Sequence, residues 1–144
     1  MIYEMTEADL LSVAEMAVIM WSSHSVEELV NEFRDSLKSN DSVVFIMSQN
    51  NKPIGFAQCQ LRHDYVEGTK GNPVGYLEGV FINQAYRNNG YAKELLRQCE
   101  SWALEKGCKE FASDCELDNN TSFLFHLKNG FTEANRIICF TKKL

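Results

Sequence analysis

Residues 73–103 read PVGYLEGVFINQAYRNNGYAKELLRQCESWA, and this stretch decides the fold. It begins with an apolar run typical of a strand, passes through a turn of small and polar residues, and continues with apolar residues at helical spacing. The first N–H groups of a helix have no partner inside the helix, so they point at whatever lies in the turn. The stretch therefore predicts a phosphate-binding turn.

The rest of the chain adds elements on both sides of this stretch. Before it, the patterns predict a strand at 2–5, amphipathic helices at 10–21 and 26–38, and a hairpin of strands at 42–48 and 54–61. After it, we expect a strand at 108–115, a helix at 117–127, and a strand or bent strand pair at 131–141. This order predicts an α/β (α+β) fold with a central mixed, mostly antiparallel sheet and helices on both faces.

Length and composition indicate one ordinary domain spanning residues 1–144. The 144 residues can bury a single core, and 44% hydrophobic with 24% charged residues is typical of a globular chain. The net charge of −6 and the lack of a Lys/Arg cluster argue against a nucleic-acid partner. A cationic partner fits this charge, but an acidic surface also serves solubility alone.

The cysteines indicate neither a disulfide framework nor a metal site. There are five, at positions 59, 99, 108, 115 and 139, with no CxxC pair and no His at ligand spacing. We expect most of them to be small buried side chains in a reducing cytoplasm. The first residues resemble no signal peptide, and no apolar run approaches the roughly 20 residues that span a bilayer, so we expect no membrane partner.

The turn and several other segments resemble a known family. Residues 87–92 (RNNGYA) fit the pattern Arg/Gln-x-x-Gly-x-Gly/Ala between a strand and a helix, and 127–131 (LKNGF) is similar to a later signature; both are typical of the GNAT superfamily of acetyl-CoA-dependent N-acetyltransferases. Taken alone, the hexad fits an ordinary strand–helix turn equally well. The segments YVEG, YLEGVF, EFASD and LDN, starting at 65, 76, 110 and 117, look more narrowly like the aminoglycoside 6'-N-acetyltransferases.

The resemblance implies a fold, a reaction and partners. The fold is the GNAT fold, whose sheet is splayed between two strands. The reaction moves acetyl from acetyl-CoA to the 6'-amino group of an aminoglycoside antibiotic by direct attack in a ternary complex, which confers resistance. It needs no metal, and the related enzymes are commonly homodimers.

The resemblance also assigns the cofactor half of the site. Backbone N–H groups of the turn wrap the pyrophosphate, strand N–H groups hold the thioester carbonyl, and a polar residue at the start of the later helix contacts the pantetheine. The positions implied are Val80, Phe81, Ile82, Asn88, Asn89, Gly90, Tyr91, Ala92, Lys93 and Asn119.

Two carboxylates are the candidates for amine recognition. Strand alternation places Val74, Tyr76, Glu78, Val80 and Ile82 on one face, where Glu78 is the only charged residue. Burying a carboxylate without a partner is costly, so Glu78 faces a cation or proton in a site, or else it pairs with an Arg. We expect Glu78 to be the base, directly or through a water, that neutralises the attacking amine. Asp114 borders the same crevice if its strand lies beside that of Glu78; otherwise it is a strand-end residue.

The other candidates come from the resemblance and remain open. Many GNAT enzymes have a Tyr four residues before the Gly-Phe to protonate the leaving thiolate, and this chain has His126 there, which is either that acid or a structural His. Trp21 and His24 line the sugar pocket of the related enzymes, although Trp21 also completes an apolar helix stripe. Tyr65 stacks on a sugar or covers the core. Asn135 replaces an acid that the related enzymes tend to have.

Two other functions fit the same sequence. A GNAT enzyme can acetylate another small amine, such as a polyamine, or a protein terminus. A non-catalytic acyl-CoA-binding sensor would keep the phosphate turn alone, and the pair Glu78 and Asp114 argues against it.

Overall fold

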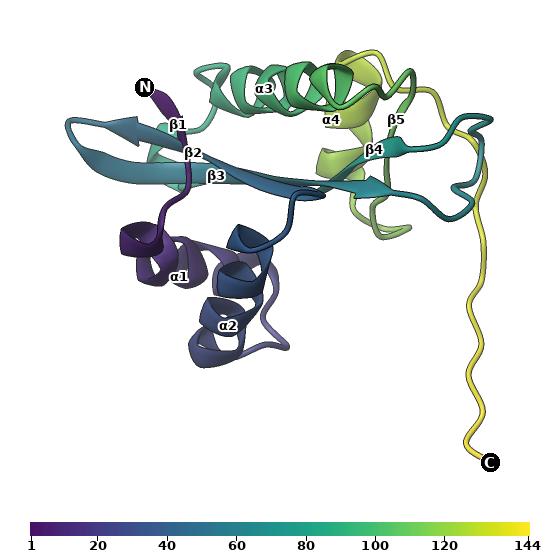
Figure 1. Cartoon of the computed structure of the whole chain (residues 1–144), viewed down its shortest axis with the longest axis horizontal. Coiled ribbons are helices and arrows are strands. Elements are labelled where there is room, and N and C mark those ends of the chain that lie inside the picture. The colour runs from purple at the N-terminus through teal and green to yellow at the C-terminus, as the bar shows by residue number, and fades with distance from the viewer.

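A computed structural model describes the whole chain, residues 1–144. Its centre is one five-stranded sheet in which the strands follow the order of the chain (Figure 1). The strands are β1 (Ile2–Glu4), β2 (Ser42–Gln49), β3 (Lys52–Arg62), β4 (Val74–Ile82) and β5 (Phe111–Ser113). Neighbours from β1 to β4 are antiparallel, and β5 runs parallel to β4. The predicted mixed, mostly antiparallel sheet is confirmed.

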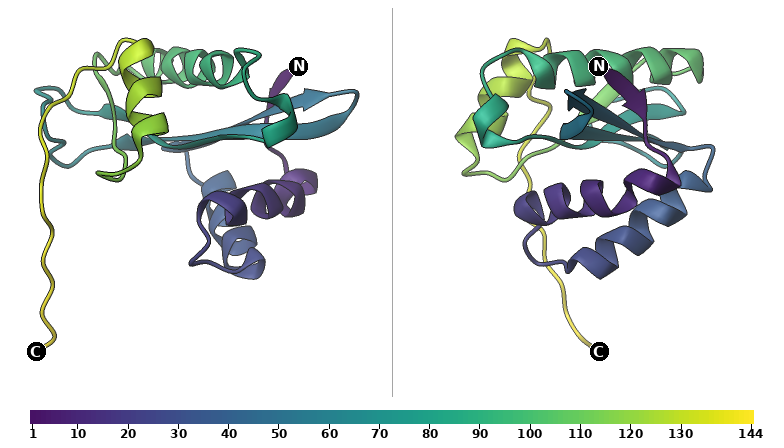
Figure 2. Two further views of the ribbon diagram at one scale, coloured as in Figure 1. Left: turned by 180° about the vertical axis from the view of Figure 1, so that it is seen from behind. Right: turned by 90° about the vertical axis from the view of Figure 1, so that its left-hand side faces the viewer.

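Helices cover both faces of this sheet (Figures 1 and 2). Below the sheet in Figure 1 lie α1 (Leu10–Met20) and α2 (Val26–Leu37). On the opposite face lies α3 (Tyr91–Glu105), and α4 (Asn120–Lys128) packs beside it at the β5 end. Short 3-10 turns, Glu7–Asp9 and Gln84–Tyr86, precede α1 and α3.

The helices pack on the sheet through two hydrophobic layers. On the α1–α2 side, Phe33 and Phe56 are fully buried and meet edge to face at 5.9 Å between ring centroids. On the α3 side, Leu95 and Leu96 pack against Ile54 and neighbouring strand residues. Burying a large apolar side chain contributes about 1.5–3 kcal/mol. β3 and β4 lie between both layers, so the side chains they carry are held by packing on both faces.

The end of the chain differs from the sequence expectation. Residues 131–144 form no strand. Phe131 still packs against Phe111 and His126, and the segment then runs away from the body of the molecule (Figures 1 and 2), with the side chains of Ile137, Ile138 and Phe140 exposed. The β-branched composition of this segment favours a strand, but a strand exists only where a neighbour accepts its hydrogen bonds. Within one copy of the chain, no strand lies beside this segment.

Candidate active site

A β-bulge in β4 places Glu78. In the pairing of β3 with β4, Gln58 lies opposite Gly79 and the next residue, Cys59, lies opposite Leu77, so Glu78 has no partner. An extra residue of this kind reverses the alternation of the strand beyond it. The prediction that the even-numbered residues 74–82 share one face is therefore wrong after Glu78. Val80 and Ile82 pack in the α3 layer, and Phe81 packs in the α1–α2 layer.

Glu78 opens into a hollow on the α1–α2 side of the sheet. The hollow has a volume of about 570 Å³ and is lined mainly by polar side chains. Its lining residues are Trp21, His24, Glu32, Asp35, Ser36, Ser39, Ser42, Gln58, Gln60 and Glu78. They include three carboxylates and no Lys or Arg, and such a cavity favours a polycation electrostatically.

The α2 residues of this hollow were missed by the sequence analysis. Glu32 and Asp35 lie on the exposed side of α2, at a spacing typical of a solvated helix face. His24 lies within 3.4 Å of Glu28 and 3.7 Å of Glu32, measured from its Nδ1 to a carboxylate oxygen. No sequence signal separates such acids from ordinary solvated ones, because the fold alone brings α2 opposite Glu78.

Glu78 is also paired with an arginine, the alternative that the sequence analysis left open. Arg62, the last residue of β3, bonds both carboxylate oxygens: its guanidinium NH2 lies 3.0 Å from Oε1 and 3.1 Å from Oε2, and its Nε lies 3.3 Å from Oε1. The Arg62 guanidinium carbon lies 3.4 Å from the centre of the Tyr76 ring, in cation–π contact. The side chain of Glu78 is 20% exposed and that of Arg62 is 42% exposed.

Asp114 joins this group through Tyr76. Asp114 follows β5, which pairs with β4 at Leu77 and Ser113, so the two strands are the neighbours that the sequence analysis required. The Tyr76 hydroxyl donates a hydrogen bond to the Asp114 carboxylate. Burial, followed by that hydrogen bond, raises the pKa of Tyr76 well above its ordinary value, so the phenol stays neutral and keeps donating.

The remaining substrate candidates lie around this group in different ways. Trp21 follows α1 as its C-cap, packs on Phe33 and Phe56 at 6.5 and 6.2 Å between ring centroids, and also lines the hollow. Tyr65 is 77% exposed in the loop between β3 and β4. Asn135 lies exposed in the C-terminal segment. The structure does not bring Tyr65 or Asn135 into the hollow.

The predicted phosphate turn lies at the start of α3. Gly90 precedes α3 with φ of 81°, a left-handed conformation that glycine adopts without strain, and no side chain caps the helix. A Cβ at Gly90 would meet no other atom within 4 Å, so the space above it is open. The side-chain amide of Asn89 donates to the carbonyls of Tyr86 and Arg87 and so holds the turn. The free N–H groups here can receive an anion.

The strand gap between β4 and β5 separates this turn from Glu78. The two strands pair only from Gly75 to Leu77, so β4 has no strand neighbour on that side at 78–82. Backbone groups in an open strand edge are available to a ligand. This is the splayed sheet implied by the resemblance, and it leaves Val80, Phe81 and Ile82 beside a path from the turn to Glu78.

The α4 candidates lie across this gap. Asn119 caps α4, since its side-chain oxygen accepts from the Ser122 N–H at 3.1 Å. His126 has both ring nitrogens engaged: Nδ1 lies 2.7 Å from the Ser122 carbonyl, and Nε2 lies 2.8 Å from the Ser113 hydroxyl. Ser113 in turn lies 3.2 Å from the carbonyl of Leu77 on β4. Ser113 is a further residue that the sequence analysis did not single out.

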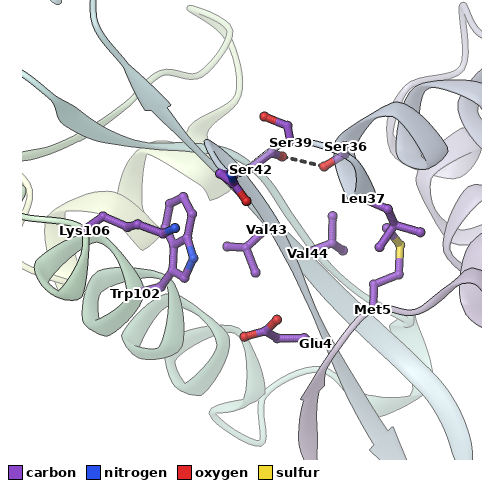
Figure 3. A pocket seen from close by; sticks show the side chains of 11 residues that line it. Glu4, Met5, Ser36, Leu37, Ser39, Ser42, Val43, Val44, Trp102 and Lys106 are labelled. Atoms are coloured by element: carbon purple, nitrogen blue, oxygen red, sulfur yellow. Dashed lines mark hydrogen bonds between the residues drawn. The ribbon is translucent and has the colours of Figure 1, made fainter.

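A second hollow adjoins the first and shares Ser36, Ser39 and Ser42 with it. It has a volume of about 200 Å³, lies at the start of β2, and includes Glu4, Trp102 and Lys106 (Figure 3). Ser36 and Ser42 bond to each other at its rim, and none of the predicted site residues lines it. No group of three or more His, Cys, Asp or Glu side chains is placed to hold a metal ion, and no helix is long and apolar enough to cross a membrane.

Comparison with known proteins decides the family. Residues 10–131 match the family model described as Acetyltransferase (GNAT) family. The chain belongs to the GNAT acetyltransferases. This acetyltransferase is 34% identical over 139 residues to an aminoglycoside N(6')-acetyltransferase type 1 of Acinetobacter haemolyticus, covering 96% of this chain and 95% of the relative. It is 31% identical over 144 residues to the enzyme of that name from Stenotrophomonas maltophilia, covering 99% and 93%.

Solved structures agree with this assignment. AAC(6')-Iy, in a complex with the bisubstrate analogue CoA-S-monomethyl-acetylneamine, superposes with a TM-score of 0.95 at 32% identity and covers 100% of this chain and 98% of its own. The aminoglycoside 6'-N-acetyltransferase AAC(6')-Ih of Acinetobacter baumannii superposes with a TM-score of 0.92 at 32% identity, covering 100% and 98%. The GNAT fold and the resemblance to the aminoglycoside 6'-N-acetyltransferases are confirmed.

Proposed function

We propose that this GNAT acetyltransferase moves acetyl from acetyl-CoA to the 6'-amino group of aminoglycoside antibiotics, and so confers resistance. One observation carries the proposal: the acid-lined hollow that Glu78 enters lies directly beside the open edge of β4. A polycationic acceptor and a thioester can therefore meet at Glu78. The relatives named for this activity, and the neighbour solved with a bisubstrate analogue, support it.

In this proposal the cofactor lies along the gap between β4 and β5. Backbone N–H groups from Asn88 to Lys93 hold the pyrophosphate at the positive end of α3. The pantetheine arm passes Asn119, and N–H groups at 80–82 receive the thioester carbonyl and the negative charge that develops on it. The AAC(6')-Iy structure solved with CoA, at a TM-score of 0.96 and 32% identity, supports this half of the proposal.

The chemistry proceeds without a covalent enzyme intermediate. Glu78, directly or through a water, accepts a proton from the 6'-ammonium, and the neutral amine attacks the thioester carbon. The C–N bond forms, the C–S bond breaks, and CoA leaves as a thiolate that must gain a proton. We assign that proton to His126 in its doubly protonated form. The Nε2–H gives its proton to the Ser113 oxygen while the Ser113 hydroxyl gives its own proton to the thiolate, and neutral His126 keeps its Nδ1–H on the Ser122 carbonyl.

The remaining amines of the substrate are assigned to the walls of the hollow and to Asp114, which is not one of the residues that line it. Asp114, which accepts a hydrogen bond from Tyr76, attracts one cationic amine. His24 and Trp21 lie on either side of the sugar. We keep Tyr65 and Asn135 as residues that contact the outer rings of a large aminoglycoside.

Release of free CoA thiol from acetyl-CoA tests the activity. The assay compares tobramycin and kanamycin with spermidine and with a peptide bearing a free N-terminus. Turnover on the aminoglycosides alone is expected. Turnover on spermidine or the peptide, with none on aminoglycosides, would assign the chain to another GNAT activity; CoA binding without turnover on any amine would indicate a sensor.

We further propose that two copies of the chain associate through the C-terminal segment. Phe140 is 88% exposed, and Ile137 and Ile138 beside it are also exposed, which is unfavourable unless a partner covers them. A second copy fits because an unpaired extended segment can complete a sheet edge of its partner. Deleting residues 137–144 should turn a dimer into a monomer in analytical ultracentrifugation, whereas deleting 142–144 should not. A monomeric full-length chain would contradict the proposal.

The cytoplasm remains the proposed location. All five cysteines are free thiols, and Cys59, Cys99 and Cys108 are buried, which suits a reducing compartment.

A further inference from the structure

The pairing of Arg62 with Glu78 conflicts with the role of Glu78 as a base. The following inference rests on the proposed function, in which Glu78 has that role. A base must reach the proton that it accepts, at about 2.6–3.2 Å between heavy atoms or through one bridging water. In the structure the guanidinium of Arg62 occupies both oxygens of Glu78 at 3.0 and 3.1 Å. The substrate ammonium, or the water that carries its proton, therefore needs the position that Arg62 now fills.

The Arg62 guanidinium and the substrate ammonium repel each other too strongly to bind Glu78 together. Like charges that meet within about 4 Å repel, and only one fifth of the Glu78 side chain is open to water that could screen them. Arg62 can leave at the cost of its contact with the Tyr76 ring, because its side chain is 42% exposed and the guanidinium can move into water without carrying charge into the core. Glu78 cannot move in the same way, since it projects from a bulge in a strand packed on both faces.

We propose that Arg62 is a resident cation: it holds Glu78 in the free enzyme, and the 6'-ammonium of the substrate displaces it. Substrate binding is then an exchange of one cation for another at Glu78. The net gain in affinity comes from the other amines, which meet Glu32 and Asp35 across the hollow. Arg62 is thus a specificity-determining residue, because an amine with a single charge replaces Arg62 and gains nothing more.

The exchange also has a consequence for the product. Acetylation removes the charge of the 6'-nitrogen, so the product no longer competes with Arg62 for Glu78. The guanidinium returns to the carboxylate and favours release. Loss of Arg62 should therefore strengthen the binding of substrate and leave the binding of the 6'-acetylated product unchanged.

The test measures binding by calorimetry in the presence of CoA, with tobramycin and with 6'-N-acetyltobramycin as ligands. For Arg62→Gln we expect a Kd for tobramycin roughly three- to tenfold lower than that of the wild type, because a partly exposed charge-assisted pair no longer has to be broken. The Kd of the acetylated product should stay the same. Arg62→Lys keeps the charge but cannot bond both carboxylate oxygens as a guanidinium does. Its Kd for tobramycin should lie between those of the wild type and Arg62→Gln.

Arg34→Gln is the matched control. Arg34 pairs with Glu7 at 3.1 Å, its side chain is 41% exposed, and the substitution changes the net charge of the protein by the same amount. It should leave the Kd of tobramycin unchanged. If Arg34→Gln lowers the Kd as much as Arg62→Gln does, the effect is one of overall charge and the inference is overturned.

A spectroscopic readout follows the exchange directly. The Nε–H of Arg62, bonded to Glu78 Oε1, should give a 15N–1H signal that shifts or broadens when tobramycin is added and stays in place with the acetylated product. If wild-type protein acetylates tobramycin but the signal does not change, or Arg62→Gln binds tobramycin no more tightly, the exchange is overturned and the proposed function stands. If the wild type neither binds nor acetylates tobramycin, the proposed function fails first.

Discussion

Replacing Glu78 by Gln preserves the shape of the side chain and removes both its charge and its capacity to accept a proton. If Glu78 is the base, kcat/KM for tobramycin should fall by about 10²–10⁴, the contribution typical of general base catalysis. The effect on folding should be far smaller. The lost partner, Arg62, is 42% exposed, so the pair contributes about 1 kcal/mol or less, equivalent to roughly 4 °C in Tm for a chain of this size.

Three measurements separate catalysis from folding. Steady-state release of CoA thiol gives kcat/KM, thermal unfolding gives Tm, and calorimetry with CoA shows whether the cofactor half of the site is intact. We expect CoA binding to persist. Without the base, the ammonium must lose its proton to water, so the residual rate should rise about tenfold per pH unit while the amine is mostly protonated.

Glu7→Gln is the matched substitution for this experiment. Glu7 also pairs with an arginine, Arg34, at 3.1 Å, but neither of these two residues lines the hollow. It should leave kcat/KM unchanged. A Glu78→Gln enzyme that works within about threefold of the wild-type rate would show that Glu78 has only a structural role, as the partner of Arg62.

Two glycines allow the halves of the site to be perturbed separately. In Gly79→Ala, the new Cβ would lie 2.7 Å from the Trp21 ring and 2.8 Å from the Met20 methyl, so stability should fall by about 1–3 kcal/mol in chemical denaturation and KM for tobramycin should rise, with KM for acetyl-CoA unchanged. An unchanged tobramycin KM would mean that the Trp21 ring does not shape the substrate pocket. In Gly90→Ala, the strain of positive φ costs about 1–2 kcal/mol and the added methyl faces the phosphate site, so KM for acetyl-CoA should rise severalfold. Gly107→Ala, at φ of 90° with equally open space, carries the same strain at the other end of α3 and should leave that KM unchanged; equal effects of the two would argue against the phosphate turn.

Local pattern predicted most of the secondary structure. The apolar periodicity of α2 and α3 and the β-branched run of β2 are properties of neighbouring residues, and the elements fall within a few residues of their expected bounds. The position of the glycine turn was also predicted, because Gly90 at the start of α3 needs only a strand before it and a helix after it. Signals of this kind depend on spacing along the chain, which the sequence contains in full.

The substrate half of the site depended on long-range contacts. Strand alternation predicted that Glu78 is an isolated charge, but the bulge that aims it depends on register with β3, and its partner Arg62 lies 16 residues away. The acids of α2 looked like any solvated helix face until the fold placed α2 opposite Glu78.

The sequence and the tertiary structure therefore determined different features of this protein. The sequence by itself determined most of the elements, the family and the position of the glycine turn before α3, because each depends on residues close together in the chain. Only the tertiary structure decided the reversed alternation after Glu78, the cation that already occupies it, and the unpaired state of residues 131–144. Each of these features depends on which distant segment of the chain packs beside the residue. The free energy of such long-range contacts cannot be read from the pattern of neighbouring residues.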